Sequence, residues 1–234
     1  MRLMLVPILS LALVACANVN YATIEKGEFS GEVAVVWLRG TGSLGDGTFI
    51  YVPTPNRPLT FTRPNGETAG KTITPPMMYT DGGSVPGLAR AFRGFTPWNY
   101  GPAYVVHDWV FMARQCLNAG RTDPVYQALE DLTFQDSAEI IAESIKALEK
   151  SGRVKAGDIS GPGVTFAVTS PFSHALWRKA ACREVTPEHR KMALEAVGRK
   201  PEVGDASRLR ILVGPDGAPQ AAQGVVVAVA RFDE

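Results

Sequence analysis

The segment that decides the fold is residues 103–117, with the sequence AYVVHDWVFMARQCL. It is a long apolar run that carries an imidazole, His107, beside a carboxylate, Asp108. Its length favours a buried helix over a strand. Residues 118–120, Asn-Ala-Gly, should end this helix, because Asn and Gly tolerate the left-handed conformation of a C-cap. Asp123 and Pro124 then predict the start of a second helix, which we expect to run to Leu148 and to pack antiparallel to the first.

The residues before the first helix are typical of short strands and turns. Val-, Trp- and Thr-rich stretches alternate with Pro and Gly, and the predicted strands are 32–38, 49–52, 59–62 and 71–74. Beyond residue 150 we expect a helix over 186–197 and a terminal hairpin formed by 208–213 and 225–232. The chain is therefore predicted to be α+β: a small antiparallel N-terminal sheet packed on an antiparallel two-helix core, with a C-terminal helical extension and a terminal hairpin.

The N-terminus has the pattern of an export signal. Residues 3–14 form an apolar run that is too short to cross a bilayer and has the length of a secretory signal core. It ends in Leu13-Val14-Ala15-Cys16, which resembles the lipobox of bacterial lipoproteins. The resemblance implies cleavage before Cys16, acylation of its thiol and, with Ala at position 17, the periplasmic face of the outer membrane. An ordinary secretory signal with a chance cysteine is the alternative.

These features predict four segments: a signal peptide over 1–15, a lipidated and flexible tether over 16–30, a core domain over 31–150, and a C-terminal extension over 151–234. Several acyl chains on one residue would anchor the protein stably to a membrane, which is the partner we expect. The 24 Lys and Arg residues balance 23 Asp and Glu residues, and this balance argues against a nucleic-acid partner.

Two cysteines remain once Cys16 carries lipid. Cys116 and Cys182 are predicted to form a disulfide, because an exported chain folds in an oxidising compartment. The alternative is a pair of buried free thiols.

Two short motifs contain the candidate site residues. The first is Thr80-Asp81-Gly82-Gly83-Ser84-Val85-Pro86, and the second is His107-Asp108-Trp109. Neighbouring residues of a helix point about 100° apart, so His107 and Asp108 should border one cleft without pairing with each other. Asp131 or Asp136 of the second helix, together with Asp81 and Ser84 of the loop, could complete that cleft.

The paired motifs, followed by an Asp-bearing helix, resemble the bacterial and phage family called domain of unknown function 1353. The resemblance covers residues 31–148 and implies no established activity.

The same order of motifs is similar, more weakly, to secreted phospholipases A2. That similarity implies a Ca²⁺ ion held by Asp108 and the carbonyls of Gly82 and Gly83, with His107 as the general base and Asp136 or Asp131 orienting it. The chain departs from that family because its flanking cysteines and its Tyr-Gly-Cys loop pattern are absent, and because Phe111 stands where a supporting Tyr would fall.

Two other interpretations use the same residues. Ser84 as a nucleophile fits poorly, since a nucleophile elbow needs Gly-x-Ser-x-Gly. A purely structural cluster is the stronger alternative. In it Asp81 and Ser84 stabilise a turn, His107 is a core histidine, and Asp108 is paired with an arginine (Arg90, Arg93 or Arg121). The sequence thus predicts a membrane-anchored metal-dependent hydrolase or, alternatively, a non-catalytic envelope or phage-derived binding or assembly lipoprotein.

Overall fold

The structure is a computed structural model that describes residues 17–39, 47–64, 69–80, 100–154, 168–198 and 224–232. The predicted signal peptide, Cys16, the loop residues Asp81, Gly82, Gly83 and Ser84, and the arginines Arg90 and Arg93 lie outside the described residues.

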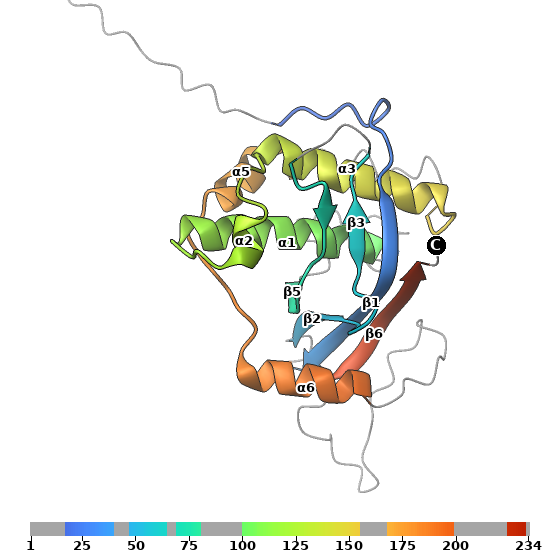
Figure 1. The fold of residues 1–234 in the computed structure, drawn as a ribbon, viewed down its shortest axis with the longest axis vertical. Coiled ribbons are helices and arrows are strands. Elements are labelled where there is room, and N and C mark those ends of the chain that lie inside the picture. The colour runs from blue at the N-terminus through green and yellow to red at the C-terminus, as the bar shows by residue number, and fades with distance from the viewer. Residues whose placement is uncertain are drawn as a thin grey trace, which may run out of the picture.

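A curled antiparallel sheet and a set of helices make the fold α+β, as predicted (Figure 1). The strands are β1 (Glu28–Arg39), β2 (Gly47–Pro53), β3 (Thr60–Thr62), β4 (Thr72–Ile73), β5 (Met78–Thr80) and β6 (Val225–Phe232). Their order is β4-β3-β1-β2-β5, and β6 pairs with β1. The helices are α1 (Gly101–Asn118), α2 (Pro124–Gln127), α3 (Phe134–Lys150), α5 (Pro171–Trp177) and α6 (Pro187–Gly198).

Both faces of the sheet bury apolar side chains, because successive residues of a strand point to opposite sides. Val33 and Val35 of β1 belong to the main core with α1 and α3. Val36 and Leu38 belong to a smaller cluster that includes Ala193 and other residues of α6. The sheet is therefore covered by α1 and α3 on one face and by α6 on the other.

The predicted second helix is interrupted. It consists of α2 and α3, separated by a turn, and α1 and α3 are the long pair that packs together. Thr133 ends the turn as the N-cap of α3, where its hydroxyl accepts a hydrogen bond from the Asp136 amide and the Asp136 carboxylate accepts one from the Thr133 amide. This reciprocal capping box stabilises a helix start at Phe134, so the prediction of one helix from 124 to 148 was wrong.

The C-terminal strand completes the N-terminal sheet. β6 pairs with β1 from Gly31 opposite Phe232 to Trp37 opposite Val225. The strand predicted at 225–232 is therefore present and joins the N-terminal sheet, while its expected hairpin partner, 208–213, lies outside the described residues.

The segment predicted to be a flexible tether is instead part of the folded structure. Ala17 and Tyr21 pack against the main core, and the Asn18 backbone is hydrogen-bonded to the side chain of Gln135. Residues 28–30 already belong to β1. Among the described helices none is both long and apolar enough to cross a membrane.

A disulfide joins Cys116 of α1 to Cys182, across 66 residues of sequence. It fixes the segment after α5 to the main helical pair.

Candidate functional site

The two sequence motifs meet where β5 ends and α1 passes. Thr80, the last residue of β5 and the first of the Thr80–Pro86 motif, is buried. Its hydroxyl donates a hydrogen bond of 2.6 Å to Oδ2 of Asp108. The first residue of the loop motif therefore contacts the His-Asp motif, and the rest of that loop lies outside the described residues.

His107 has a buried ring nitrogen to which none of the described residues is hydrogen-bonded. Its ring packs on Phe111, with 4.7 Å between the centroids, and its Nε2 is inaccessible to solvent and unpaired. Burial lowers the pKa of His107 to about 4, so the imidazole is neutral at pH 7. Buried polar groups are nearly always hydrogen-bonded, and an exception is a candidate for a functional role.

Tyr104 lies one turn before His107 on the same face of α1 and also has a buried polar atom. Its side chain is buried, and its hydroxyl has no hydrogen-bond partner within the part of the chain that the structure describes. Burial, and after it the neighbouring Tyr100 and Asp108, raise the pKa of Tyr104 above its ordinary value. The hydroxyl thus stays protonated and can act as a hydrogen-bond donor.

The carboxylates expected to orient His107 lie elsewhere. Asp136 is in the first turn of α3, where its two oxygens accept hydrogen bonds from Thr133 and Arg63. Burial works in the opposite direction, but these hydrogen bonds lower the pKa of Asp136. Asp131 is exposed in the turn before α3. Neither is hydrogen-bonded to His107, so the described residues place no orienting carboxylate beside the imidazole.

Of the three arginines considered as partners of Asp108, Arg90 and Arg93 lie outside the described residues, and Arg121 lies elsewhere. Arg121 pairs with Asp123 at 3.0 Å and with Glu184 at 2.9 Å, at the surface. Among the described residues, no group of three or more His, Cys, Asp or Glu side chains is placed to hold a metal ion. Of the ligands that the phospholipase similarity implies, only Asp108 is described, since Gly82 and Gly83 lie outside the described residues.

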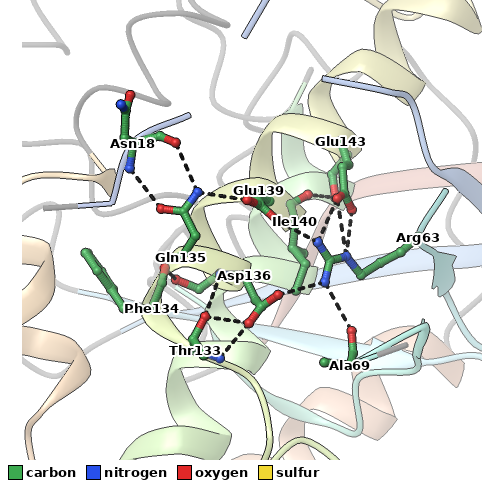
Figure 2. Close-up of polar contacts among 12 residues, drawn as sticks. Asn18, Arg63, Ala69, Thr133, Phe134, Gln135, Asp136, Glu139, Ile140 and Glu143 are labelled. Carbon is green, nitrogen blue, oxygen red and sulfur yellow. Dashed lines mark hydrogen bonds and ion pairs between the residues drawn. The ribbon is translucent and has the colours of Figure 1, made fainter. Parts of the chain in front are cut away.

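A second polar cluster, which the sequence analysis missed, is centred on Arg63 (Figure 2). The Arg63 side chain has no exposed surface, and it donates to both oxygens of Glu143, at 2.8 and 3.0 Å. It also donates to Glu139 and to Asp136, at 3.1 Å each. The three acidic residues are spaced three and four apart on one face of α3, a pattern that could have indicated a shared basic partner.

The N-terminal segment lies along the same helix. Gln135 accepts a hydrogen bond from the Asn18 amide at 2.9 Å and donates one to the Asn18 carbonyl at 3.0 Å (Figure 2). Further along α3, the Lys146 ammonium lies over the Tyr21 ring, 5.1 Å from its centroid. These contacts fix the chain against α3 from its first described residues.

Comparison with known proteins gives no relative. No protein-family model matches the chain, and neither a curated protein nor a solved structure is significantly similar to it. The resemblances drawn from the motifs therefore stay predictions.

Proposed function

We propose that this chain is a lipid-anchored envelope hydrolase, acylated at Cys16, with a site centred on His107 of α1. The observation that carries the proposal is the buried, unpaired Nε2 of His107 beside the Thr80–Asp108 hydrogen bond. Leaving such a group unpaired costs roughly 1–3 kcal/mol, and a functional site is a common reason for that cost.

The proposed reaction is hydrolysis of an ester, and the anchor makes phospholipids the first substrate class to test. Nε2 of His107 is closed to solvent in this structure, so the reaction requires a local opening that admits water and the ester. In the opened state neutral His107 would take a proton from water through Nε2 while the water oxygen attacks the ester carbonyl carbon. The unpaired hydroxyl of Tyr104 can donate to the oxygen that becomes negative. The proton on His107 then passes to the leaving alkoxide as the bond between carbonyl carbon and alkoxide oxygen breaks.

The proposed steps do not depend on a metal ion. If Ca²⁺ binds through Asp108 and the carbonyls of Gly82 and Gly83, it would stabilise negative charge on the substrate. Melting curves recorded with and without Ca²⁺, Mg²⁺ and Zn²⁺ test this separately, because an ion that binds only the folded state must raise the melting temperature. The Asp108→Asn variant should lose that response.

The decisive experiment measures fatty-acid release from phosphatidylethanolamine and phosphatidylglycerol vesicles by the mature chain. We expect His107→Gln to reduce the rate by about 100-fold or more, since a general base contributes factors of that order. His189→Gln is the matched control, because His189 lies on α6 and is hydrogen-bonded to Tyr79. Full activity of the His107→Gln protein would overturn the proposal.

A second candidate function is a non-catalytic binding or assembly lipoprotein. The Thr80–Asp108 hydrogen bond favours it, since a buried hydroxyl that satisfies a carboxylate is also a normal structural contact. In this case the wild type releases no fatty acid, no divalent ion raises its melting temperature, and Asp108→Ala lowers that temperature sharply.

A further inference from the structure

The predicted lipid anchor is very close to the folded surface. Cys16 precedes Asn18 by two residues in the sequence, and two residues of any chain span at most about 7 Å. Asn18 is fixed to Gln135 at the start of α3 by two hydrogen bonds. A bilayer that holds acyl chains on Cys16 would therefore lie next to the N-terminal end of α3.

Helix α5 lies at that same end of the molecule (Figure 1). Phe134, the residue before Gln135, contacts the rings of His174 and Trp177, with centroid distances of 4.9 and 6.1 Å. Two side chains of α1 hold α5 in place, because Gln115 and Asn118 donate hydrogen bonds to the carbonyls of its last residues. The outward face of α5 is thus fixed relative to the anchor.

That outward face is apolar. Phe172 is 65 % exposed, the largest exposure among the large hydrophobic side chains that the structure describes. Pro171 and Ala175 are exposed beside it, while Ser173 and Trp177 are buried on the opposite face. Phe is among the side chains that interfacial helices bury at the boundary between lipid headgroups and acyl chains.

The charges around this face favour apolar insertion over electrostatic binding. Arg178 and Lys179 are exposed just after α5, but Glu130 and Asp131 are exposed in the turn before α3. Because the two signs balance at this end of the molecule, attraction to anionic lipids should be weak, and apolar contact should dominate.

We infer that the face of α5 formed by Pro171, Phe172 and Ala175 inserts into the phospholipid surface that holds the anchor. This inference rests on the proposed acylation of Cys16. It gives the anchored protein one orientation, with α5 and the start of α3 against the membrane. The face of the sheet covered by α6 is directed elsewhere (Figure 1).

Hydroxyl-radical footprinting of the mature lipidated chain in phosphatidylethanolamine–phosphatidylglycerol vesicles tests the inference. We expect oxidation of Phe172 to fall severalfold relative to the unlipidated chain in solution. Oxidation of Leu194, which is 51 % exposed on α6, is the internal control and should not change.

A partition measurement with the unlipidated chain from Ala17 tests the contact without the anchor. We expect Phe172→Ser to lower its binding to the same vesicles by about tenfold, and Leu194→Ser to leave binding unchanged. Both positions are exposed, so neither change should prevent folding. The inference would be overturned if binding disappeared in 0.5 M salt and if the Phe172→Ser variant bound as well as the unchanged chain.

The mass of the mature chain shows whether Cys16 is acylated, so the proposed anchor is tested separately from the insertion of α5. An acylated Cys16 together with unchanged oxidation of Phe172 overturns the docking face and leaves the anchor standing. A mature chain without acyl groups overturns the anchor, and with it this orientation on the membrane.

Discussion

At the scale of single residues, Arg63 is a buried charged side chain that pairs with three acidic residues of α3. Its guanidinium is fully buried against Glu143, which is itself buried. We expect Arg63→Ala to lower the free energy of unfolding by about 3–5 kcal/mol, because the change leaves a buried carboxylate without its partner. Equilibrium unfolding in urea measures this difference.

The control for Arg63 is Arg121, which forms ion pairs with Asp123 and Glu184 at the surface. Exposed ion pairs contribute little, so Arg121→Ala should cost far less than Arg63→Ala. A double variant, Arg63→Met with Glu143→Leu, should recover much of the loss, because no charge of the central pair is then buried unpaired. Equal losses for Arg63→Ala and Arg121→Ala would contradict the structural role of the cluster.

His107 makes stability depend on pH. Its folded-state pKa, about 4, lies below its ordinary value of 6.5, so the folded protein binds this proton more weakly than the unfolded chain does. Titration of His107 therefore leaves the free energy of unfolding unchanged above pH 6.5 and lowers it as the pH falls from 6.5 toward 4. We expect His107→Gln to flatten the fall in melting temperature between pH 6.5 and pH 5, a window above the ordinary range of carboxylate titration.

The sequence could predict the meeting of the two motifs but not the surroundings of His107. Gly-rich and His-Asp motifs on consecutive elements imply a shared cleft, and Thr80 does contact Asp108. Asp136 was expected beside His107 because a single helix from residue 124 would continue past it. The capping box turns Asp136 toward Thr133 and Arg63 instead, and the side-chain geometry of a cap depends on where the helix starts.

At the scale of elements, the bend in β1 depends on a glycine. Gly31 has a φ of +85°. Residues 28–30, before it, pair with β3, and residues 33–39, after it, pair with β2. A Cβ at this position would lie 2.1 Å from the carbonyl oxygen of Pro58. Both the conformation and the close approach of the backbone therefore require glycine.

A comparison of two glycines separates these requirements. Gly120 has a φ of +81°, but a Cβ there would meet no atom within 4 Å. We expect Gly120→Ala to cost about 1–2 kcal/mol, the cost of a left-handed alanine, and Gly31→Ala to cost clearly more. Urea unfolding of both variants provides the test. Equal costs would mean that the carbonyl of Pro58 moves aside freely.

The sequence predicts the strongly periodic elements best. The apolar pattern of α1 and the Asn-Ala-Gly at its end could be recognised without a structure. The hydrophobic pattern hides the break between α2 and α3, because Leu129 and Leu132, which lie in the turn, are buried and keep nearly helical spacing with Ile140 and Ile141. The signal that could have shown it is Thr133 followed three residues later by Asp136, the sequence pattern of a capping box.

At the scale of the whole molecule, the disulfide joins α1 to the segment after α5. Closing a loop of 66 residues stabilises the folded state by about 4 kcal/mol at most, through the entropy that it removes from the unfolded chain. We expect reduction to lower the free energy of unfolding by about 2–4 kcal/mol. The unlipidated chain from Ala17 suits this measurement, since Cys116 and Cys182 are then its only cysteines. An unchanged urea midpoint in the presence of a reducing agent would contradict this contribution.

The pairing of β6 with β1 brings the two ends of the chain into one sheet. The sequence indicates a strand at 225–232, but the choice of partner depends on contacts across about 200 residues, which local patterns cannot specify. The contact is extensive in the structure, where seven residues of β1, from Gly31 to Trp37, have partners in β6. The Arg231 guanidinium also donates a hydrogen bond of 2.8 Å to Glu32.

This pairing predicts that residues 31–150 do not form an independent domain. A chain that ends at Gly198 lacks β6, so it leaves one edge of β1 unpaired and uncovers apolar residues of both cores. Exposed strand edges promote association between chains, and we therefore expect the shortened protein to aggregate or to lose cooperative unfolding. Size-exclusion chromatography and urea unfolding of chains 17–198 and 17–234 test this expectation. A monomeric 17–198 chain with an unchanged unfolding midpoint would mean that β6 is an appendage, and would restore the boundary at residue 150 that the sequence suggests.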